Sequence, residues 1–379
     1  MPARSSLPDL SGRVCVITGA TRGIGRATVD GLAALDARVV LLCRRQDAGD
    51  RIASELAAAR RGPPPDVVVV DLSSQRSVRE AADTLRDRYP RIHVLINNAG
   101  VIPQQREVTA DGLEMQFAVN HLAYFMLTGL LLDRLTAGAP ARVVNVTSGA
   151  HQGGTLDLAD LQSQRRYDPV RVYGRTKLAN VLFTYELARR IRSTGVTANC
   201  LHPGVIATQL LADYMNVPVV GGAVAPALGG DPSEGADATV FLAASPEVET
   251  ITGRYFVGRR ESRSSPASYD ETLQRRLWEE SARLASLVDV ATPRPPAIER
   301  RISGMPIYAY RCAACGTEFE RLVRSETRVA CPGCDGRKLQ RLMSLTARPA
   351  GNAGSADYSR LGPPPGGGCC GGGCHSHNH

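Results

Sequence analysis

The sequence predicts an α/β protein with a doubly wound parallel sheet of about seven strands, followed by a much smaller cysteine-rich unit. Three observations support this fold class. Short apolar runs alternate with helical patterns over the first 290 residues, as in a parallel sheet covered on both faces. A glycine-rich turn, Gly19-Ala-Thr-Arg-Gly23-Ile-Gly25, follows the first of these runs. Seven of the ten cysteines lie beyond residue 311, which indicates a separate C-terminal unit.

Charge and cysteine usage narrow the class of protein. The net charge of +8 comprises 33 basic and 31 acidic residues in 1–290 but 12 and 6 afterwards, so the excess lies mostly in the C-terminal part. Cys15, Cys43 and Cys200 stand singly in apolar runs, which favours a reducing cytoplasm over a secreted disulfide framework. The longest apolar segment, Leu122–Leu132, is bounded by polar residues, so neither a membrane span nor a signal peptide is predicted.

The first strand and its turn predict a nucleotide site. Arg13–Thr18 is an apolar run, the glycine turn follows it, and a helix is expected over Ile24–Leu35. Glycines let backbone N–H groups approach a pyrophosphate at the positive end of the helix. The spacing Gly-x-x-x-Gly-x-Gly departs from the common dinucleotide fingerprint, and an ordinary tight turn is the alternative.

The second strand, Arg38–Cys43, indicates which dinucleotide binds. An acidic residue at this strand end would bind the ribose of NAD, whereas arginine accommodates the 2′-phosphate of NADP. Here the strand continues into Arg44 and Arg45, and Arg22 lies in the glycine turn. The site is therefore interpreted as NADP(H)-selective, with solvated surface arginines as the alternative.

Five more strands and four more helices are expected along the first unit. The strands are short apolar runs at 66–72, 92–97, 142–148, 196–201 and 253–257. The helices are expected at 111–135, around Tyr173, at 233–244 and at 268–290. Segment 209–232, rich in glycine, alanine, valine and proline, is interpreted as a lid over an apolar pocket, with a surface insertion as the alternative.

Three asparagines in otherwise apolar surroundings need hydrogen-bond partners. Asn97 and Asn98 end the strand at 92–97, where they either satisfy loop backbone groups or help to fix the adenosine side of a cofactor. Asn120 lies within the apolar helix expected at 111–135. This amide either bends the helix or belongs to a proton relay.

Tyr173 and Lys177 are four residues apart, so on a helix they share one face. A tyrosine exchanges protons at neutral pH only if a neighbouring positive charge favours the phenolate. Lysine is rare in this arginine-rich chain, occurring only as Lys177 and Lys338, which argues against a merely solvated helix face. Ser148 ends an apolar strand, and strand ends are where open α/β sheets keep their reactive groups.

Taken together, these motifs resemble the short-chain dehydrogenase/reductase family over nearly all of 10–290, a Rossmann-type domain. The matching motifs are Thr18-Gly-x-x-x-Gly-x-Gly25, Asn97-Asn-Ala-Gly100, Asn120, Ser148, Tyr173-x-x-x-Lys177 and Pro203-Gly204. The retinol-dehydrogenase-like branch is the most similar, through stretches such as Val144–His151, Lys177–Phe183 and Leu273–Trp278.

The resemblance implies a role for each matching residue. Tyr173 would be the general acid/base, Lys177 would lower its pKa and hold the nicotinamide ribose, Ser148 would hydrogen-bond the substrate oxygen, and Asn120 would hold a water linking Lys177 to solvent. The residues expected at the cofactor are Gly19, Thr21, Arg22, Gly23, Ile24, Gly25, Arg44, Asp71, Leu72, Asn98, Ala99, Gly100, Tyr173, Lys177, Pro203, Gly204, Ile206 and Thr208.

A proline-rich linker is expected at 291–304, a zinc ribbon at 305–347 and a disordered low-complexity tail at 348–379. Two Cys-x-x-Cys pairs, Cys312/Cys315 and Cys331/Cys334, are spaced as in a four-thiolate Zn²⁺ site. Two redox pairs are the alternative. The segment resembles small FmdB-type zinc-ribbon regulators. The tail's cysteines and histidines either hold a second metal or remain uncommitted.

The predicted function is a cytoplasmic NADP(H)-dependent oxidoreductase acting on an apolar alcohol, aldehyde or ketone, as a monomer or a homo-oligomer. One alternative is an NADP(H)-sensing regulator whose basic ribbon contacts a nucleic acid or protein. Another is a sugar-nucleotide epimerase or dehydratase, although the short region after Pro203 leaves little room for a nucleotide-sugar domain.

Overall fold

The computed structural model describes residues 7–59, 62–215, 229–287, 307–322 and 329–342. The chain divides into two compact units, Met1–Ile298 and Glu299–His379. The linker expected at 291–304 and the tail expected at 348–379 lie outside the described residues, as does the part of the expected lid at 216–228.

The first unit is built on an eight-stranded sheet with strand order β3-β2-β1-β4-β5-β6-β7-β8. Seven strands run parallel, and only β8 pairs antiparallel, against β7. This confirms the doubly wound α/β fold. The strands are β1 (Val14–Thr18), β2 (Arg38–Cys43), β3 (Asp66–Val69), β4 (Val94–Asn97), β5 (Ala141–Val146), β6 (Val196–His202), β7 (Tyr255–Val257) and β8 (Arg260–Ser262).

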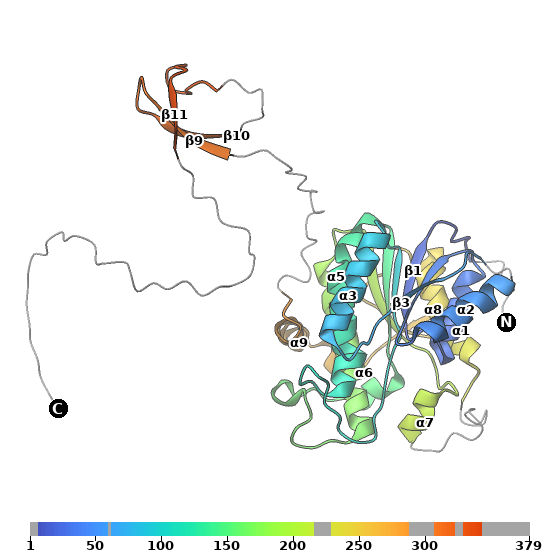
Figure 1. Cartoon of the computed structure of the whole chain (residues 1–379). Coiled ribbons are helices and arrows are strands. Elements are labelled where there is room, and N and C mark those ends of the chain that lie inside the picture. The colour runs from blue at the N-terminus through green and yellow to red at the C-terminus, as the bar shows by residue number, and fades with distance from the viewer. Residues whose placement is uncertain (1–6, 60–61, 216–228, 288–306, 323–328, 343–379) are drawn as a thin grey trace, which may run out of the picture. The chain divides into compact units, whose positions relative to one another are not determined.

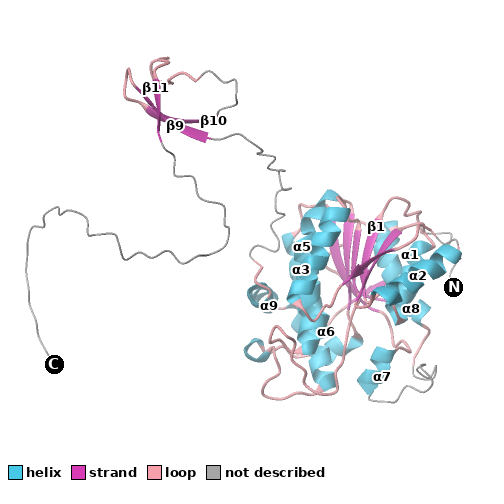
Figure 2. Ribbon diagram, in the orientation of Figure 1, coloured by secondary structure: helices cyan, strands magenta, loops and turns pink. Residues whose placement is uncertain are grey.

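Helices cover both faces of this sheet (Figures 1 and 2). One layer contains α3, α5 and α6, and the other contains α1, α2 and α8. The helices are α1 (Gly23–Ala33), α2 (Gln46–Ala58), α3 (Gln75–Arg88), α4 (Met115–Phe117), α5 (Ala123–Ala137), α6 (Pro169–Arg190), α7 (Gln209–Met215), α8 (Pro232–Ala244) and α9 (Glu271–Leu284).

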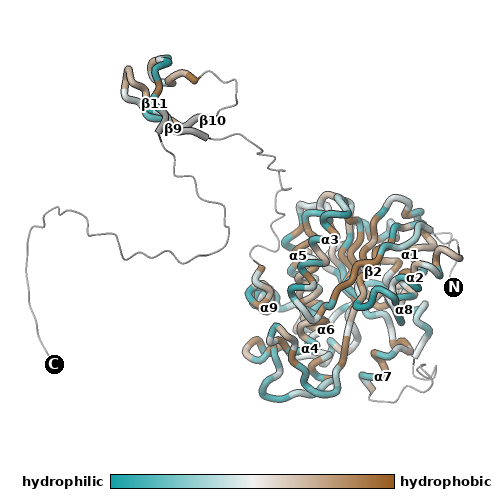
Figure 3. The backbone as a smooth tube through the Cα atoms, in the orientation of Figure 1, coloured by the Kyte–Doolittle hydropathy of each residue, from teal (hydrophilic) through white to brown (hydrophobic). Residues whose placement is uncertain are grey.

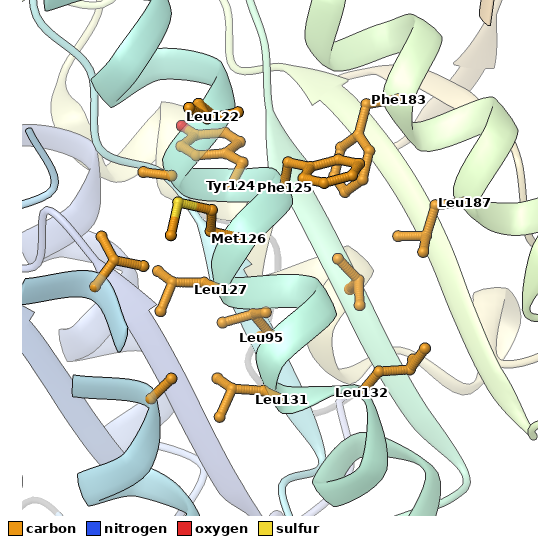
Figure 4. Close-up of a cluster of buried hydrophobic side chains, with 14 of the residues drawn as sticks. Leu95, Leu122, Tyr124, Phe125, Met126, Leu127, Leu131, Leu132, Phe183 and Leu187 are labelled. Carbon is orange, nitrogen blue, oxygen red and sulfur yellow. The ribbon is translucent and has the colours of Figure 1, made fainter. Parts of the chain in front are cut away.

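Alternation along β1 divides the core into two parts. Val14 and Val16 pack with α3, α5 and α6, whereas Cys15 and Ile17 pack with α1, α2 and α8, because successive strand side chains point to opposite faces. The residues of highest hydropathy lie in the centre of the first unit, for example along β2 (Figure 3). Figure 4 shows side chains of α5 meeting those of α6 in the first of these clusters.

The helix expected at 111–135 starts later and is interrupted. Its first turn is α4, a π turn follows at Ala118–Leu122, and α5 continues to Ala137. Among the described residues, Met115–Ala137 is the one helix long and apolar enough to cross a membrane, but 83% of its most apolar window is buried. That burial is what a core helix of a globular domain shows.

Several boundaries differ from the sequence expectations, and the helix expected at 268–290 ends at Leu284. The strand expected at 66–72 ends at Val69, because Asp71 turns the chain by accepting a hydrogen bond from the backbone of Ser73. The terminal helix begins at Glu271, where Asp270 caps it, rather than at 268. The start of the expected lid forms the helix α7.

The second unit contains a three-stranded antiparallel sheet with strand order β10-β9-β11. Its strands are β9 (Ile307–Cys312), β10 (Glu318–Leu322) and β11 (Leu339–Leu342). The first Cys-x-x-Cys pair begins at Cys312, the last residue of β9, and continues into the turn that follows, whereas the second lies in the segment before β11.

Candidate functional site

A pocket with a volume of about 790 Å³ opens at the carboxyl ends of the parallel strands. Its centre lies where the strand order reverses between β1 and β4, the switch point at which open α/β sheets bind ligands. Every residue expected at the cofactor lines it: Gly19, Thr21, Arg22, Gly23, Ile24, Gly25, Arg44, Asp71, Leu72, Asn98, Ala99, Gly100, Tyr173, Lys177, Pro203, Gly204, Ile206 and Thr208. Ser148 lines it as well, whereas Asn120 does not.

The glycine turn can accept an anion. Gly19 and Gly23 have φ of 66° and 55°, which favours glycine, and a Cβ on Gly25 would lie 2.1 Å from the carbonyl oxygen of Gly19. No side chain caps the N-terminus of α1 at Arg22. The first N–H groups of this helix therefore remain available to a phosphate, and the turn fits a dinucleotide cofactor.

Asn98 links this turn to β4. Its Nδ2 donates to the carbonyl oxygens of Thr18 (3.0 Å) and Gly19 (3.3 Å), and its backbone N–H donates to the Thr18 hydroxyl. The side chain thus satisfies loop backbone, one of the two roles considered for it. Asn97 instead points into the core, where its Nδ2 donates to Thr128 and Asn145.

The arginines after β2 are in different environments. Arg44 lines the pocket, and no ion pair involving it is recorded within the described residues. Arg45 pairs with the carboxylate of Asp47 at the start of α2, and this partner raises the pKa of the guanidinium. Arg44 is therefore the more available partner for an anionic group bound at this end of the pocket.

Tyr173 and Lys177 lie on α6 at the inner end of the pocket, 5% and 1% exposed. The Lys177 Nζ is 5.5 Å from the centroid of the Tyr173 ring and donates to the carbonyl oxygen of Val146 at 3.1 Å. Burial lowers the pKa of Lys177 to about 7. Burial also raises the pKa of Tyr173, and a hydrogen bond with Ser148 opposes that rise.

These shifts qualify the role expected for Lys177. A buried lysine with a pKa of about 7 carries only part of its charge at neutral pH. The expected lowering of the Tyr173 pKa by Lys177 stays a prediction.

The same burial makes Lys177 costly for folding. Because its pKa falls from 10.5 to about 7 on folding, the unfolded chain binds the proton more tightly, and the penalty is complete below pH 7 and fades as the pH rises toward 10.5. Lys177→Met should therefore stabilise the first unit by about 1–4 kcal/mol near pH 6, and by less at pH 9.

Urea unfolding at both pH values measures this difference. Arg171→Met, which removes an exposed cation from the same helix, is the control and should change stability little. A Lys177→Met protein no more stable than wild type at pH 6 would contradict the assignment of this penalty.

Ser148 follows β5 and begins a short 3-10 turn at Gly149–Gly153. Its hydroxyl accepts a hydrogen bond from the backbone N–H of Ala150 at 3.2 Å. The strand thus ends in a side chain held at the pocket wall, next to Tyr173 in the same lining.

Asn120 sits at the π turn, fully buried behind the pocket wall. Its Oδ1 accepts from the N–H of Val101, its Nδ2 donates to the Val101 carbonyl and to Thr176, and its own carbonyl accepts from Asn180. The side chain therefore fastens an interrupted helix to the loop after β4. A relay through Asn120 stays a prediction.

Several pocket residues were not anticipated from the sequence. Tyr214 on α7 meets the Tyr173 ring edge-on, with centroids 5.7 Å apart. His202 precedes Pro203-Gly204 and also lines the pocket, and burial lowers its pKa. The pocket lining also includes the apolar residues Met115, Val119, Leu210 and Leu211. Of these residues, only His202 had a signal in the sequence, because it directly precedes Pro203-Gly204 at a strand end.

A second candidate site lies within the second unit. The sulfur atoms of Cys312, Cys315, Cys331 and Cys334 lie within 4.8 Å of one another, and the closest pairs are 3.5 and 3.6 Å apart. Zn–S bonds of about 2.3 Å in a tetrahedron place sulfurs about 3.8 Å apart. The backbone N–H groups of Ala314 and Gly333 donate to two of the thiols. The four residues fit a zinc ion.

Comparisons with known proteins agree with this geometry. The sequence model of the short chain dehydrogenase family matches residues 13–216, and that of a zinc ribbon domain matches residues 305–343. Human retinol dehydrogenase 14 is 41% identical over 296 residues, which cover 74% of this chain and 88% of that protein. Mouse retinol dehydrogenase 13 is 40% identical over 292 residues, covering 76% and 86%.

Solved structures give the same result. A protein from Mycobacterium paratuberculosis is 32% identical with a TM-score of 0.62, covering 75% of this chain and 97% of that one. Pseudomonas aeruginosa RhlG, solved as an active-site complex with NADP, is 26% identical with a TM-score of 0.53, covering 66% and 95%.

Proposed function

The chain belongs to the short-chain dehydrogenase/reductase family, and on that premise we propose that it interconverts an apolar alcohol and its carbonyl compound with NADP(H). Family membership makes the chain an NAD(P)-dependent oxidoreductase with a zinc ribbon appended. The observation that carries the proposal is the convergence of Ser148, Tyr173 and Lys177 at the inner end of one pocket.

Tyr173 transfers the proton. When bound, NADP(H) supplies or accepts the hydride. The Tyr173 phenol donates a proton to the carbonyl oxygen during reduction and accepts it during oxidation. Lys177 favours the phenolate once its ammonium is charged, and its Nζ also provides a hydrogen-bond donor for a ribose hydroxyl.

Ser148 orients the substrate oxygen toward Tyr173. Its hydroxyl lines the same pocket, whose lining also includes the apolar side chains of Met115, Val119, Leu210 and Leu211. Such a wall favours a hydrocarbon chain next to the reacting carbon, because apolar contacts supply affinity while few polar groups fix orientation. The retinol dehydrogenases among the relatives carry a name consistent with an apolar substrate.

Arg44 supports NADP(H) over NAD(H). Its guanidinium lies at the end of the pocket formed by β2. The position directly after β2 is thus an arginine rather than an acid, and the nearby Asp47 already pairs with Arg45. Arginine binds a 2′-phosphate through charge-assisted hydrogen bonds. The related RhlG structure contains NADP.

Arg44→Asp should shift cofactor preference toward NAD(H) by at least about tenfold, because it removes a phosphate partner and adds repulsion. Dissociation constants for NADPH and NADH measure the shift. Arg45→Asp is the matched control: Arg45 already pairs with Asp47, so a smaller effect is expected. Equal shifts in both variants would show that the overall positive charge after β2, and not Arg44 in particular, sets the cofactor preference.

The ribbon is proposed to bind one Zn²⁺ through Cys312, Cys315, Cys331 and Cys334, which supplies the free energy that a small sheet lacks. We propose that the oxidoreductase domain spans 10–290, the linker 291–304, the zinc ribbon 305–347 and the low-complexity tail 348–379. A cytoplasmic location is proposed because free thiols persist at Cys15, Cys43 and Cys200 in the described residues.

Screening purified protein with aldehydes, ketones and alcohols against NADP(H) and NAD(H) tests the proposed function. Oxidation of NADPH with apolar carbonyl compounds supports it. Binding of NADPH without turnover of any compound in the screen would favour the regulatory alternative instead.

A further inference from the structure

His151 connects the end of β5 to a distant turn. It lies in the 3-10 turn that starts after Ser148, and it is fully buried. Its Nδ1 lies 2.7 Å from the carbonyl oxygen of Ser148, and its Nε2 lies 3.2 Å from the backbone nitrogen of Ser265. The ring packs against Tyr255 of β7, with centroids 4.8 Å apart.

The partners fix the protonation of this ring. A backbone N–H can only donate, so Nε2 accepts from Ser265 and carries no proton. The proton is therefore on Nδ1, which donates to Ser148. Burial lowers the pKa of His151, so the ring stays neutral at neutral pH. One tautomer satisfies both contacts.

The Ser265 end of this connection is itself held in place. Ser268 donates through its hydroxyl to the Ser265 carbonyl at 2.6 Å, and its hydroxyl lies 2.6 Å from that of Ser264. Ser264 is bonded in turn to the phenol of Tyr185 on α6 at 2.7 Å. His151 thus ties the backbone of Ser148 to a turn anchored on the same helix that carries Tyr173 and Lys177.

We propose that His151 is a positioning residue for the reaction: it holds the main chain of Ser148 so that the hydroxyl meets the substrate oxygen. This inference rests on the role of Ser148 in the proposed function. Hydrogen-bonding groups that act on a reacting atom lose efficiency when displaced by a fraction of an ångström. The connection through His151 restricts such displacement.

A double-mutant cycle between His151 and Ser148 tests the proposal. His151→Leu should lower kcat/KM for the carbonyl compound by about tenfold with NADPH affinity unchanged. His151→Asn, which keeps a donor near the Nδ1 position, should recover most of the loss. In a Ser148→Ala background, His151→Leu should have less than about a twofold effect.

If His151 variants fold poorly, variants of Ser265 test the contact between the His151 Nε2 and the Ser265 N–H. Ser265 has φ of −61°, which proline adopts. Ser265→Pro replaces the N–H by a ring carbon that points at the His151 Nε2, so it breaks this contact and displaces the imidazole. It should reproduce part of the loss in kcat/KM. Ser265→Ala keeps this N–H, and its hydroxyl has no partner within the described residues, so activity should be retained.

Equal losses from His151→Leu in the wild-type and Ser148→Ala backgrounds would overturn the inference, because the substitution would then act on general stability. A Ser265→Pro protein with the same kcat/KM as wild type would overturn the inference as well. Failure of the proposed function is distinguishable, because wild-type protein would then reduce no carbonyl compound. Failure of the role of Ser148 alone would leave carbonyl reduction unchanged in the Ser148→Ala protein.

Discussion

Replacing Tyr173 by phenylalanine is expected to lower turnover by at least about a hundredfold while changing NADPH affinity less than about threefold. The substitution removes only the hydroxyl of a side chain that is 5% exposed and packs against Tyr214. The ring and its contacts remain, so the pocket keeps its shape. The proton that the carbonyl oxygen needs is absent, and this affects the chemical step alone.

Single-turnover kinetics with saturating NADPH measure this effect on the chemical step. Tyr214→Phe is the matched control, because it removes a neighbouring phenol from the same pocket and should reduce turnover far less. Near-normal turnover of the Tyr173→Phe protein would exclude Tyr173 as the general acid/base.

Removing zinc is expected to unfold the second unit while leaving oxidoreductase activity within about twofold of its starting value. The four thiols lie together in a unit of three short strands, and removing the metal removes the cross-link that would join its two turns. Among the residues that the structure describes, those lining the pocket belong to the first unit.

Zinc analysis, protease resistance of the second unit and NADPH oxidation measured together test this separation. Cys331→Ser should abolish binding of about one zinc per chain, whereas a chain shortened after residue 347 should retain it. Loss of activity on chelation would show that the ribbon is coupled to catalysis. Retention of zinc by the Cys331→Ser protein would indicate that residues of the tail bind the metal.

The sequence predicted those parts of the site that depend on local spacing. The glycine turn, the four-residue interval between Tyr173 and Lys177, and the polar end of β5 each follow from the geometry of one element. The parallel sheet then places these elements at one edge. That is why all the expected cofactor residues line a single pocket.

Other features depend on contacts between distant segments. Tyr214 reaches Tyr173 only because α7 folds over the pocket, and α7 lies in a segment without a clear pattern. At the π turn, the Asn120 side chain bonds the backbone of Val101, and the Asn120 carbonyl accepts from Asn180. His151 finds Ser265 across 114 residues. None of these pairings has a signal in the local sequence.

Transfer of deuterium from [4-²H]NADPH to the carbonyl carbon of an apolar aldehyde or ketone tests the central claim most directly. The account predicts that wild-type protein forms the deuterated alcohol from the label on one face of the nicotinamide, that Tyr173→Phe slows its formation by at least about a hundredfold, and that NADH is the poorer donor. Wild-type protein that binds NADPH yet transfers no deuterium to any such compound would contradict it.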